Sequence, residues 1–390
     1  MGVVVKGFED RLSTTFRLDD HGAIISIKLS PDQNILAIQR AKSVVEFFNV
    51  SQIGPHGQLD TKSYEQPSRN KTSTTILGYV EKRNFFSDFQ TVIVAVVNRF
   101  YWTSSVEIVY FTSHGIEVYN VLPEKRQVKS VRYLNQLISW FVFCPYSNIV
   151  VISMSKTTSS LFVFHLKNGT IYKLPKLEID PHQQIEVKEK DVVVFTNYNV
   201  VNYVAVVIHP DENAPASSST SEIILYNINK DAVTVTKTHR LQTSFNGVSG
   251  LAMHTIDDVL LVHNKQEGET FFFDVGGLSG EFDGTLSHHV SVGKPCRMTA
   301  GQEYPNWVLF PPDIVIDPNA GTMSKITLKI EALKVDEDFC GSLELPRHVS
   351  FMLQRQNAKR ALLESLLTCC VNPEEVDLTS LGTCFDRINR

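Results

Sequence analysis

Hydrophobic and polar positions along residues 24–48 form three short apolar runs that are separated by two polar turns. In the first run Ile25, Ile27 and Leu29 alternate with polar residues, which is the period of a β-strand with one buried face. Pro31 then ends this strand, because proline fixes φ and has no N–H to donate to a sheet. The segment therefore predicts three short strands, a unit that is typical of one β-propeller blade.

The same unit recurs along the chain. Further copies, with turn residues between their apolar runs, lie at 100–121, 138–166, 192–241 and 246–275. Asn168-Gly169 is a β-hairpin signal after the second of these, and 233–238 is the last apolar run of the third. Where no insertion intervenes, the copies start roughly 40–50 residues apart, which is the spacing of four-stranded blades.

A β-sandwich also alternates short strands and turns, so it is the alternative to a propeller. Several sandwich domains would be needed to use this much β pattern, and no linker divides the chain in that way. The Trp-Asp dipeptide of WD repeats is absent. We therefore predict a mainly β fold, a degenerate WD-like β-propeller of seven blades over residues 1–340.

The hydrophobic period changes to helical spacing near residue 346. Asn372-Pro373 separates two helical runs, because the residue before a proline is pushed out of the α region. The second run predicts an amphipathic helix with an apolar stripe made of Leu378, Leu381, Phe385 and Ile388. Residues 346–390 are thus predicted as the start of an α-helical solenoid, and helices packed back on the propeller are the alternative.

Composition excludes some classes of function. With 43% hydrophobic and 20% charged residues the chain has the composition of a globular protein. A formal net charge of −5 provides no basic field for nucleic acid or for an anionic membrane. The six cysteines are scattered, which favours a reducing compartment over a disulfide scaffold or a metal site.

Motifs for catalysis or cofactor binding are missing from the sequence. There is no glycine-rich loop opening a helix to hold a phosphate, and no Gly-X-Ser-X-Gly turn for a serine nucleophile. His288 and His289 are neighbours on a predicted strand, so their rings point to opposite faces and cannot chelate one ion together. We therefore predict no enzyme activity, no cofactor and no metal.

One charged loop stands out as a candidate contact surface. It is the run Leu122, Pro123, Glu124, Lys125 and Arg126, and further basic residues follow it at Lys129 and Arg132. A solvated loop is the ordinary interpretation of such a run, and partner binding is the sharper one. These five residues are the partner-binding site that the sequence predicts.

Several long motifs resemble one known family. They are GVVVKG at 2–7, FRLDDHG at 16–22, ILAIQR at 35–40, YWTSSVEIV at 101–109, GIEVYNVLPEKR at 115–126, KLPKLEI at 173–179, GEFDG at 280–284 and FPPDIVI at 310–316. In this order they closely resemble the Bulli family, whose members are also called Mic-like or regulator-of-Mon/Ccz proteins. The resemblance runs from Gly2 to about Asn389.

The resemblance implies a non-catalytic scaffold, in which an N-terminal propeller precedes an α-solenoid. Such a subunit joins the Mon and Ccz subunits in a heterotrimer that exchanges guanine nucleotide on the late-endosomal Rab GTPase. It supports endosome maturation, lysosomal trafficking and autophagy. The implied location is cytoplasmic and peripheral on late endosomes and lysosomes, with indirect membrane association.

The chain also departs from the family pattern. The family begins about two strands earlier, so we expect the first blade to be incomplete. Residues 79–99 form an atypical insertion between two blade segments. Two other classes of function stay open at this point: a coat-like vesicle protein, which shares the plan of propeller and solenoid, and a propeller hydrolase with its site in the central channel.

Overall fold

The computed structural model divides the chain into two compact units, Met1–Lys176 and Leu177–Arg390. The residues it describes are 2–6, 13–17, 22–41, 44–50, 64–67, 100–112, 114–180, 185–197, 199–209, 221–228, 234–235, 237–241, 251–264, 267–278, 286–289, 291–292, 295–297, 308–310, 313–317, 321–328, 345–371 and 377–389. The predicted insertion at 79–99 lies outside these residues. The predicted domain boundary between residues 340 and 346 and the number of blades stay predictions.

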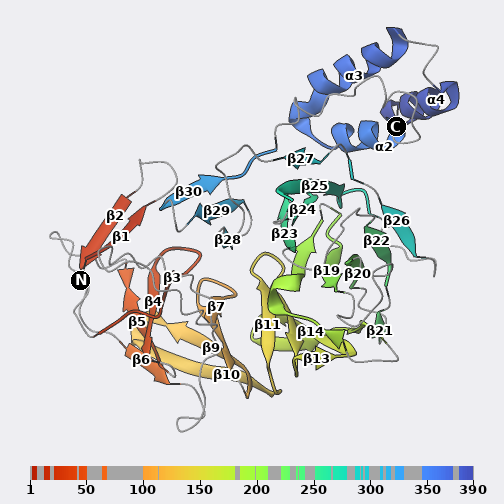
Figure 1. Ribbon diagram of the computed structural model, residues 1–390. Coiled ribbons are helices and arrows are strands. Elements are labelled where there is room, and N and C mark those ends of the chain that lie inside the picture. The colour runs from red at the N-terminus through yellow and green to blue at the C-terminus, as the bar shows by residue number, and fades with distance from the viewer. Residues whose placement is uncertain are drawn as a thin grey trace. The chain divides into compact units, whose positions relative to one another are not determined.

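The first unit consists of antiparallel sheets whose strands follow one another along the chain (Figure 1). Its strands are β1 (Gly2–Lys6), β2 (Ser13–Arg17), β3 (Ser26–Leu29), β4 (Ile35–Ala41), β5 (Val44–Asn49), β6 (Tyr64–Pro67), β7 (Phe100–Trp102), β8 (Glu107–Thr112), β9 (Gly115–Leu122), β10 (Gln127–Asn135), β11 (Trp140–Cys144), β12 (Ile149–Ser153), β13 (Thr157–Thr158), β14 (Ser160–Lys167) and β15 (Thr170–Lys173). β16 (Lys176–Glu178) begins at the last residue of this unit. Sheets β3-β4-β5-β6 and β7-β8-β9-β10 confirm the first two predicted blade segments.

Turn chemistry fixes these sheets as the sequence predicted. Between β3 and β4 the Ser30 hydroxyl donates to Asp32 Oδ1 at 2.5 Å and accepts from the Ile35 amide at 3.0 Å. Between β14 and β15, Asn168 and Gly169 both have positive φ, at 51° and 70°. Two positive φ values in succession are the requirement of a type I′ hairpin turn, whose twist matches that of the strands.

Neighbouring sheets of the first unit pack face to face. Ile108 and Tyr110 of β8 lie in one core cluster with β4 and β5, whereas Val109 and Phe111 lie in another cluster with β11 and β12. The Phe111 ring stacks on that of Phe141 with centroids 4.2 Å apart. Sheet β7–β10 is therefore covered on both faces, as a propeller blade is, and β8 is buried at every position.

The prediction of one buried face for the first strand was wrong. Ser26 is fully buried, whereas Ile25 and Ile27 are only half-buried. Lys28 lies on the face with Ser26, and its Nζ sits 3.5 Å from the ring centroid of Tyr101. Burial lowers the pKa of Lys28 well below its usual range. Residues of β7 contact this face of β3, so polar alternation there does not mark exposure.

The second unit continues with strands and ends in helices. Its elements are β17 (Ile185–Glu186), η3 (Glu189–Asp191), β18 (Val192–Thr196), β19 (Asn202–Ile208), β20 (Glu222–Asn227), β21 (Thr234–Val235), β22 (His239–Leu241), β23 (Leu251–Ile256), β24 (Val259–Asn264), β25 (Glu269–Asp274), β26 (Ser287–His289), β27 (Cys296–Arg297), β28 (Val308–Phe310), β29 (Ile314–Asp317), β30 (Thr322–Lys325), α2 (Leu345–Leu353), η7 (Gln356–Ala358), α3 (Lys359–Val371) and α4 (Leu378–Ile388). Strands β18–β20 and β23–β25 share one apolar core. The mainly β class with helices at the C-terminus is thus confirmed.

The apolar run at 233–238 contains the short strand β21, which belongs to another sheet than β20. The strand that pairs with β20 is β22. Beside β22 runs β26, which is parallel to it and places His289 opposite Leu241. The pairing joins segments about fifty residues apart, and no local periodicity could reveal it.

The helices pack both on strands and on one another. Phe351 and Met352 of α2 share a cluster with Ile256 and Leu261 of the β23-β24 hairpin. Arg355 is buried, and its guanidinium donates to the Asp257 carbonyl at 2.6 Å. The alternative of helices packed back on strands therefore holds for α2, while α3 and α4 close a second small core around Leu345.

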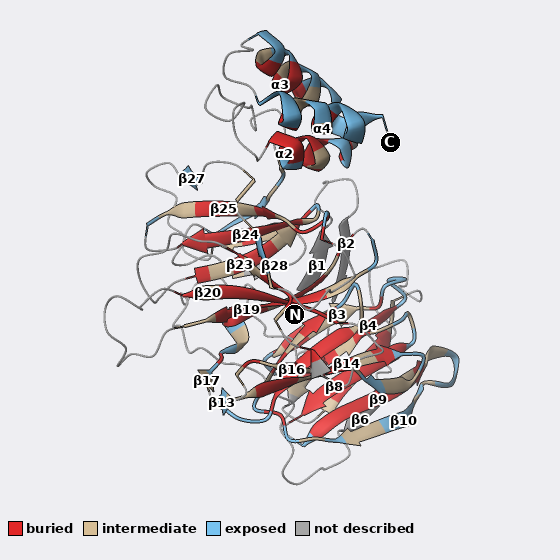
Figure 2. Cartoon of the chain, turned by 90° about the vertical axis from the view of Figure 1, so that its right-hand side faces the viewer, coloured by how far each residue is buried: buried red, intermediate tan, exposed pale blue. Residues whose placement is uncertain are grey.

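The predicted stripe of the last helix is largely exposed. Leu378 has 74% of its surface exposed and Phe385 has 45%, whereas the small residues Ser380 and Cys384 are the buried ones. Figure 2 shows exposed residues along α3 and α4, in contrast to the mostly buried strands. Among the described residues, no helix combines the length and the apolar character that crossing a membrane requires.

Candidate functional site

The predicted partner-binding loop forms a tight corner between β9 and β10. Leu122 ends β9, and Pro123–Lys125 form one turn of 3₁₀ helix, η2, with proline at its first position. Arg126 closes the turn in the left-handed conformation, and its amide donates to the Pro123 carbonyl at 3.2 Å. Glu124 and Lys125 are exposed, so the corner presents both signs of charge to solvent.

Beyond this corner β10 is the last strand of its sheet in the described residues. Lys129 and Arg132 are exposed on it, and the register shifts between Ser130 and Arg132. Such a bulge, together with charged side chains, protects a sheet edge against pairing with another chain. The predicted site is thus a solvent-exposed turn beside a sheet edge that is protected against pairing. The side-chain amide of Asn49 donates to the Pro123 carbonyl at 3.1 Å and holds this turn in place.

A cavity of about 300 Å³ lies close to β10 in the same unit, and sequence reasoning missed it. Residues from four strands and from three connections between strands line it; those used below are Thr103, Val106, Glu107, Asn120, Val131, Asn148, Lys167 and Gly169. Glu107 is the first residue of β8 and has only 7% of its surface exposed. The carboxylate at the start of this largely apolar strand was the sequence signal that could have indicated the cavity.

The turn before β8 holds the Glu107 carboxylate. The Thr103 hydroxyl donates to Glu107 Oε1 at 2.5 Å, and the Glu107 amide donates to the Ser104 hydroxyl at 3.0 Å. Asn148 donates through Nδ2 to the Thr103 carbonyl at 3.3 Å. Its Oδ1 is buried without a hydrogen-bond partner among the described residues. The cavity therefore holds two side-chain oxygens suited to accept hydrogen bonds.

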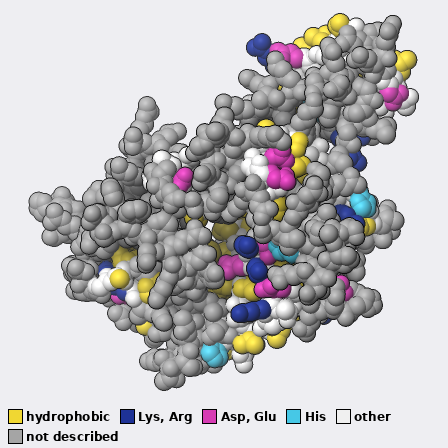
Figure 3. Space-filling view, viewed as in Figure 1, with side chains coloured by type: hydrophobic (Ala, Val, Ile, Leu, Met, Phe, Trp, Pro, Cys, Tyr) yellow, Lys and Arg dark blue, Asp and Glu magenta, His cyan; other side chains and the backbone are white. Residues whose placement is uncertain are grey.

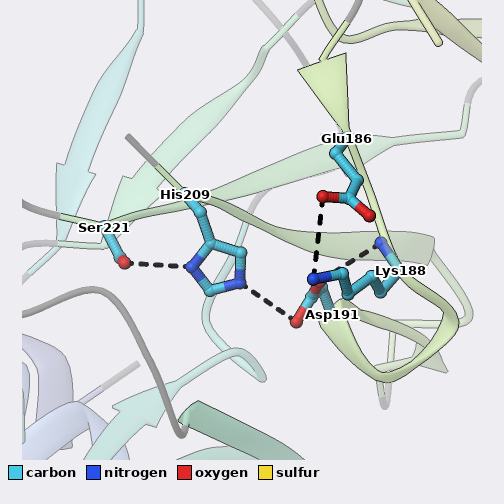
Figure 4. A network of polar contacts seen from close by, with 5 residues as sticks. All are labelled: Glu186, Lys188, Asp191, His209 and Ser221. Carbon is cyan, nitrogen blue, oxygen red and sulfur yellow. Dashed lines mark hydrogen bonds and ion pairs between the residues drawn. The ribbon is translucent and has the colours of Figure 1, made fainter. Parts of the chain in front are cut away.

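A second polar cluster lies in the other unit and combines Ser221, His209 and Asp191 (Figure 4). His209 Nδ1 lies 3.2 Å from Ser221 Oγ, and His209 Nε2 lies 3.2 Å from Asp191 Oδ1. Asp191 also accepts from the Lys188 amide through Oδ2, at 3.2 Å. Figure 4 shows the imidazole between the hydroxyl and the carboxylate, the order of a serine-hydrolase triad.

Burial argues against hydrolysis at this cluster. Ser221 has 3% of its surface exposed and Asp191 has 1%, so an incoming carbonyl carbon has no approach to the serine oxygen. The cavity of about 300 Å³ has no lining residue in common with the cluster. The arrangement instead places the His209 imidazole beside a buried carboxylate and brings η3 close to the ends of β19 and β20.

In the described part of the chain, no three His, Cys, Asp or Glu residues lie close enough together to hold a metal ion. On the face drawn in Figure 3, Lys and Arg side chains lie interspersed with Asp and Glu. A face that carries both signs of charge does not produce the positive electrostatic potential that attracts nucleic acid. His289 meets His239 at 3.0 Å, and burial lowers the pKa of His289 to about 4, so this pair is neutral at pH 7.

Comparison with known proteins gives two kinds of likeness. A family model for the N-terminal part of the regulator of MON1-CCZ1 complex matches residues 1–94. The whole chain is 30% identical to the human protein named regulator of MON1-CCZ1 complex and 29% identical to that of the mouse. The chain spans 57% of the length of each of these relatives.

Solved structures with some similarity include the β-propeller domain of Cps50 (Swd1) from Myceliophteria thermophila. That likeness has a TM-score of 0.41 at 11% identity and covers 84% of this chain and 91% of the other. The periplasmic gluconolactonase of Pseudomonas aeruginosa gives a TM-score of 0.37 at 15% identity, over 73% of this chain and 78% of the other. At such scores neither likeness is evidence for an activity.

Proposed function

We propose that this chain is a regulator of the MON1-CCZ1 complex and acts in it as a non-catalytic scaffold subunit. The observation that carries the proposal is the 30% identity to the human regulator along the whole chain. The family model at residues 1–94 supports it independently of the remaining sequence. The sequence motifs at 101–109 and 115–126, which resemble the same family, lie in well-packed strands of the first unit.

In the proposed mechanism the chain binds its partner subunits and catalyses no reaction itself. Sheets packed on both faces make a rigid support, since their strands have few side chains free to move. The only triad-like cluster in the described residues is closed to substrate, which fits a subunit that leaves nucleotide exchange to its partners. In this proposal the heterotrimer with Mon and Ccz activates the late-endosomal Rab GTPase, and it supports endosome maturation, lysosomal trafficking and autophagy.

The proposed location is the cytoplasmic face of late endosomes and lysosomes, reached through the partners. Formal net charge of −5 fits indirect membrane association, because an anionic bilayer attracts basic surfaces. Vesicles containing acidic phospholipid should therefore retain this chain only when the Mon–Ccz pair is present. Retention of the chain alone in a flotation assay contradicts the indirect route.

Co-purification tests the proposal itself. The tagged full-length protein, expressed with the Mon–Ccz pair of the same organism, should elute with both subunits in size-exclusion chromatography at low salt. A matched β-propeller protein carrying the same tag serves as the control for unspecific capture. Elution of the chain apart from the pair at micromolar concentrations contradicts membership in the complex.

A further inference from the structure

The cavity beside β10 has the chemistry of a cation receptor. Its deepest charged group is the Glu107 carboxylate, whose Oε1 accepts from Thr103 while Oε2 lies on the side of Gly169. A Cβ built on Gly169 would stand 3.6 Å from Glu107 Oε2 and 2.8 Å from Val131 Cγ1. A side chain at this position would therefore clash with Val131, and glycine lets β10 lie close to the Glu107 carboxylate.

The unsatisfied acceptor of Asn148 points to the kind of ligand. Its Oδ1 is buried without a hydrogen-bond partner among the described residues, and leaving a buried acceptor without a hydrogen bond is unfavourable. A group with several N–H donors can serve both Asn148 Oδ1 and Glu107. Guanidinium and ammonium groups have five and three such donors and no acceptor.

The apolar part of the lining favours a side chain over a bare ion. Val106 and Val131 have 44% and 42% of their surfaces exposed, and both line the cavity. Arginine and lysine bury their methylene stems on such surfaces while the charged head reaches polar groups. A metal ion is a poor fit, since Glu107 is the one carboxylate in the lining and hard cations are bound by several oxygen ligands.

Size and position favour a group presented by another protein. About 300 Å³ is the lower end of the range for ligand pockets, about 300–1,000 Å³, and suits one long side chain. Val131 belongs to β10, which is exposed along most of its length. We propose that this cavity binds the arginine or lysine side chain of a partner protein, with Glu107 as the counter-charge.

Lys167 provides a second test, in which the expected change in affinity has the opposite sign. This lysine also lines the cavity and is exposed, and no ion pair joins it to Glu107 in the described structure. Its positive charge opposes an incoming cation. Removal of Lys167 should therefore strengthen binding, whereas removal of the Glu107 charge should weaken it.

Titration of the full chain with N-acetyl-arginine N-methylamide tests this inference by ligand-observed NMR at low salt. We expect saturable binding that is about tenfold weaker in Glu107→Gln, which corresponds to about 1.4 kcal/mol, and a few-fold tighter in Lys167→Gln. Glu186→Gln, which removes an exposed carboxylate that does not line the cavity, is the matched control and should leave the affinity unchanged. The neutral citrulline analogue should not bind.

Several results overturn the inference. They are equal binding of the citrulline analogue, unchanged affinity in Glu107→Gln, weaker binding in Lys167→Gln, or no saturable binding of the arginine amide. Tighter binding of free spermidine, in competition with the amide, overturns the assignment to a protein side chain. Because Lys167 is exposed, its variant folds even where Glu107→Gln does not. These assays use no MON1-CCZ1 subunits, so their outcome is separate from that of the proposed function.

Discussion

Two buried carboxylates, Glu107 in the first unit and Asp191 in the second, have much in common and have opposite consequences. Glu107 begins β8 and accepts from the Thr103 hydroxyl, whereas Asp191 ends η3 just before β18, and the His209 imidazole lies between it and the Ser221 hydroxyl. Asp191 is closed in by His209 and by the Lys188 amide. Glu107 instead borders a cavity of about 300 Å³.

We infer that the access of a ligand to the side chains, and not their identity, distinguishes a binding site from a structural network. Ser221, His209 and Asp191 have the residue types of a hydrolase but offer no approach to substrate. Glu107 belongs to no catalytic motif, yet its side chain lines the cavity. We therefore expect mutations at Asp191 to change stability and mutations at Glu107 to change binding.

Loss of Asp191 should have the largest effect. Asp191→Ala removes the acceptor of the Lys188 amide and leaves the half-buried His209 imidazole without its carboxylate, which costs about 2–4 kcal/mol of unfolding free energy. Hydrogen–deuterium exchange of peptides covering 192–208 measures this loss in place. Exchange should accelerate in β18 and β19 and stay unchanged in β8 and β9.

Glu186→Gln is the matched control for this variant. The Glu186 side chain is 54% exposed and contacts Lys188 Nζ at 3.7 Å, so its loss should cost less than about 0.5 kcal/mol. Equal acceleration of exchange in the two variants contradicts a special role for the buried carboxylate.

Glu189, two residues before Asp191, should make stability depend on pH. Burial raises the pKa of Glu189 from 4.5 to about 7, so between these values the folded chain holds a proton that the unfolded chain has lost. The unfolding free energy then falls as pH rises through this window, on the order of 1–3 kcal/mol from pH 5 to pH 8. Glu189→Gln should abolish that part of the slope.

Urea denaturation of both proteins at pH 5 and pH 8, followed by circular dichroism, checks this result. His289 and His348 act in the opposite direction, because burial lowers the pKa of each to about 4. Their contribution to stability is present above pH 6.5 and is lost as pH falls toward 4. The difference between the parent and Glu189→Gln isolates the glutamate, and an identical slope in both contradicts its role.

Sequence predicted the strands of the first unit well but gave no sign of the cavity around Glu107. Ser30, Asp32 and the Asn168-Gly169 turn are local signals, and the structure places each where its chemistry requires. The residues that line the cavity around Glu107 come from connections that are far apart along the chain, and no local sequence pattern links these connections. The exposure of Ser26 was misjudged for the same reason, because the neighbouring sheet that covers it is far away in sequence.

The corner at Leu122–Arg126 should show a smaller effect than the buried carboxylates. Reversal of charge in Lys125→Glu with Arg126→Glu should change unfolding free energy by less than about 0.5 kcal/mol, because Lys125 is exposed and Arg126 half-buried. It should weaken binding to the Mon–Ccz pair a few-fold and make it less salt-dependent. Biolayer interferometry at two salt concentrations measures both. Unchanged affinity rejects this corner as a contact.

Ser221 should show no reactivity at all. A fluorophosphonate probe labels serines that a neighbouring base activates and that solvent reaches, and Ser221 has 3% of its surface exposed. Intact-protein mass spectrometry should find no adduct on the parent chain, as on Ser221→Ala. An adduct that disappears in Ser221→Ala contradicts the structural role of the cluster and revives the hydrolase alternative.

We propose above all that this chain works by binding within a complex and not by catalysis. Mass photometry of the full-length protein mixed with the purified Mon–Ccz pair tests it most directly, since it weighs each assembly in solution. We predict one species with the summed mass of one copy of each of the three chains. Separate masses for the pair and for this chain, at concentrations where the pair itself is intact, would contradict the claim.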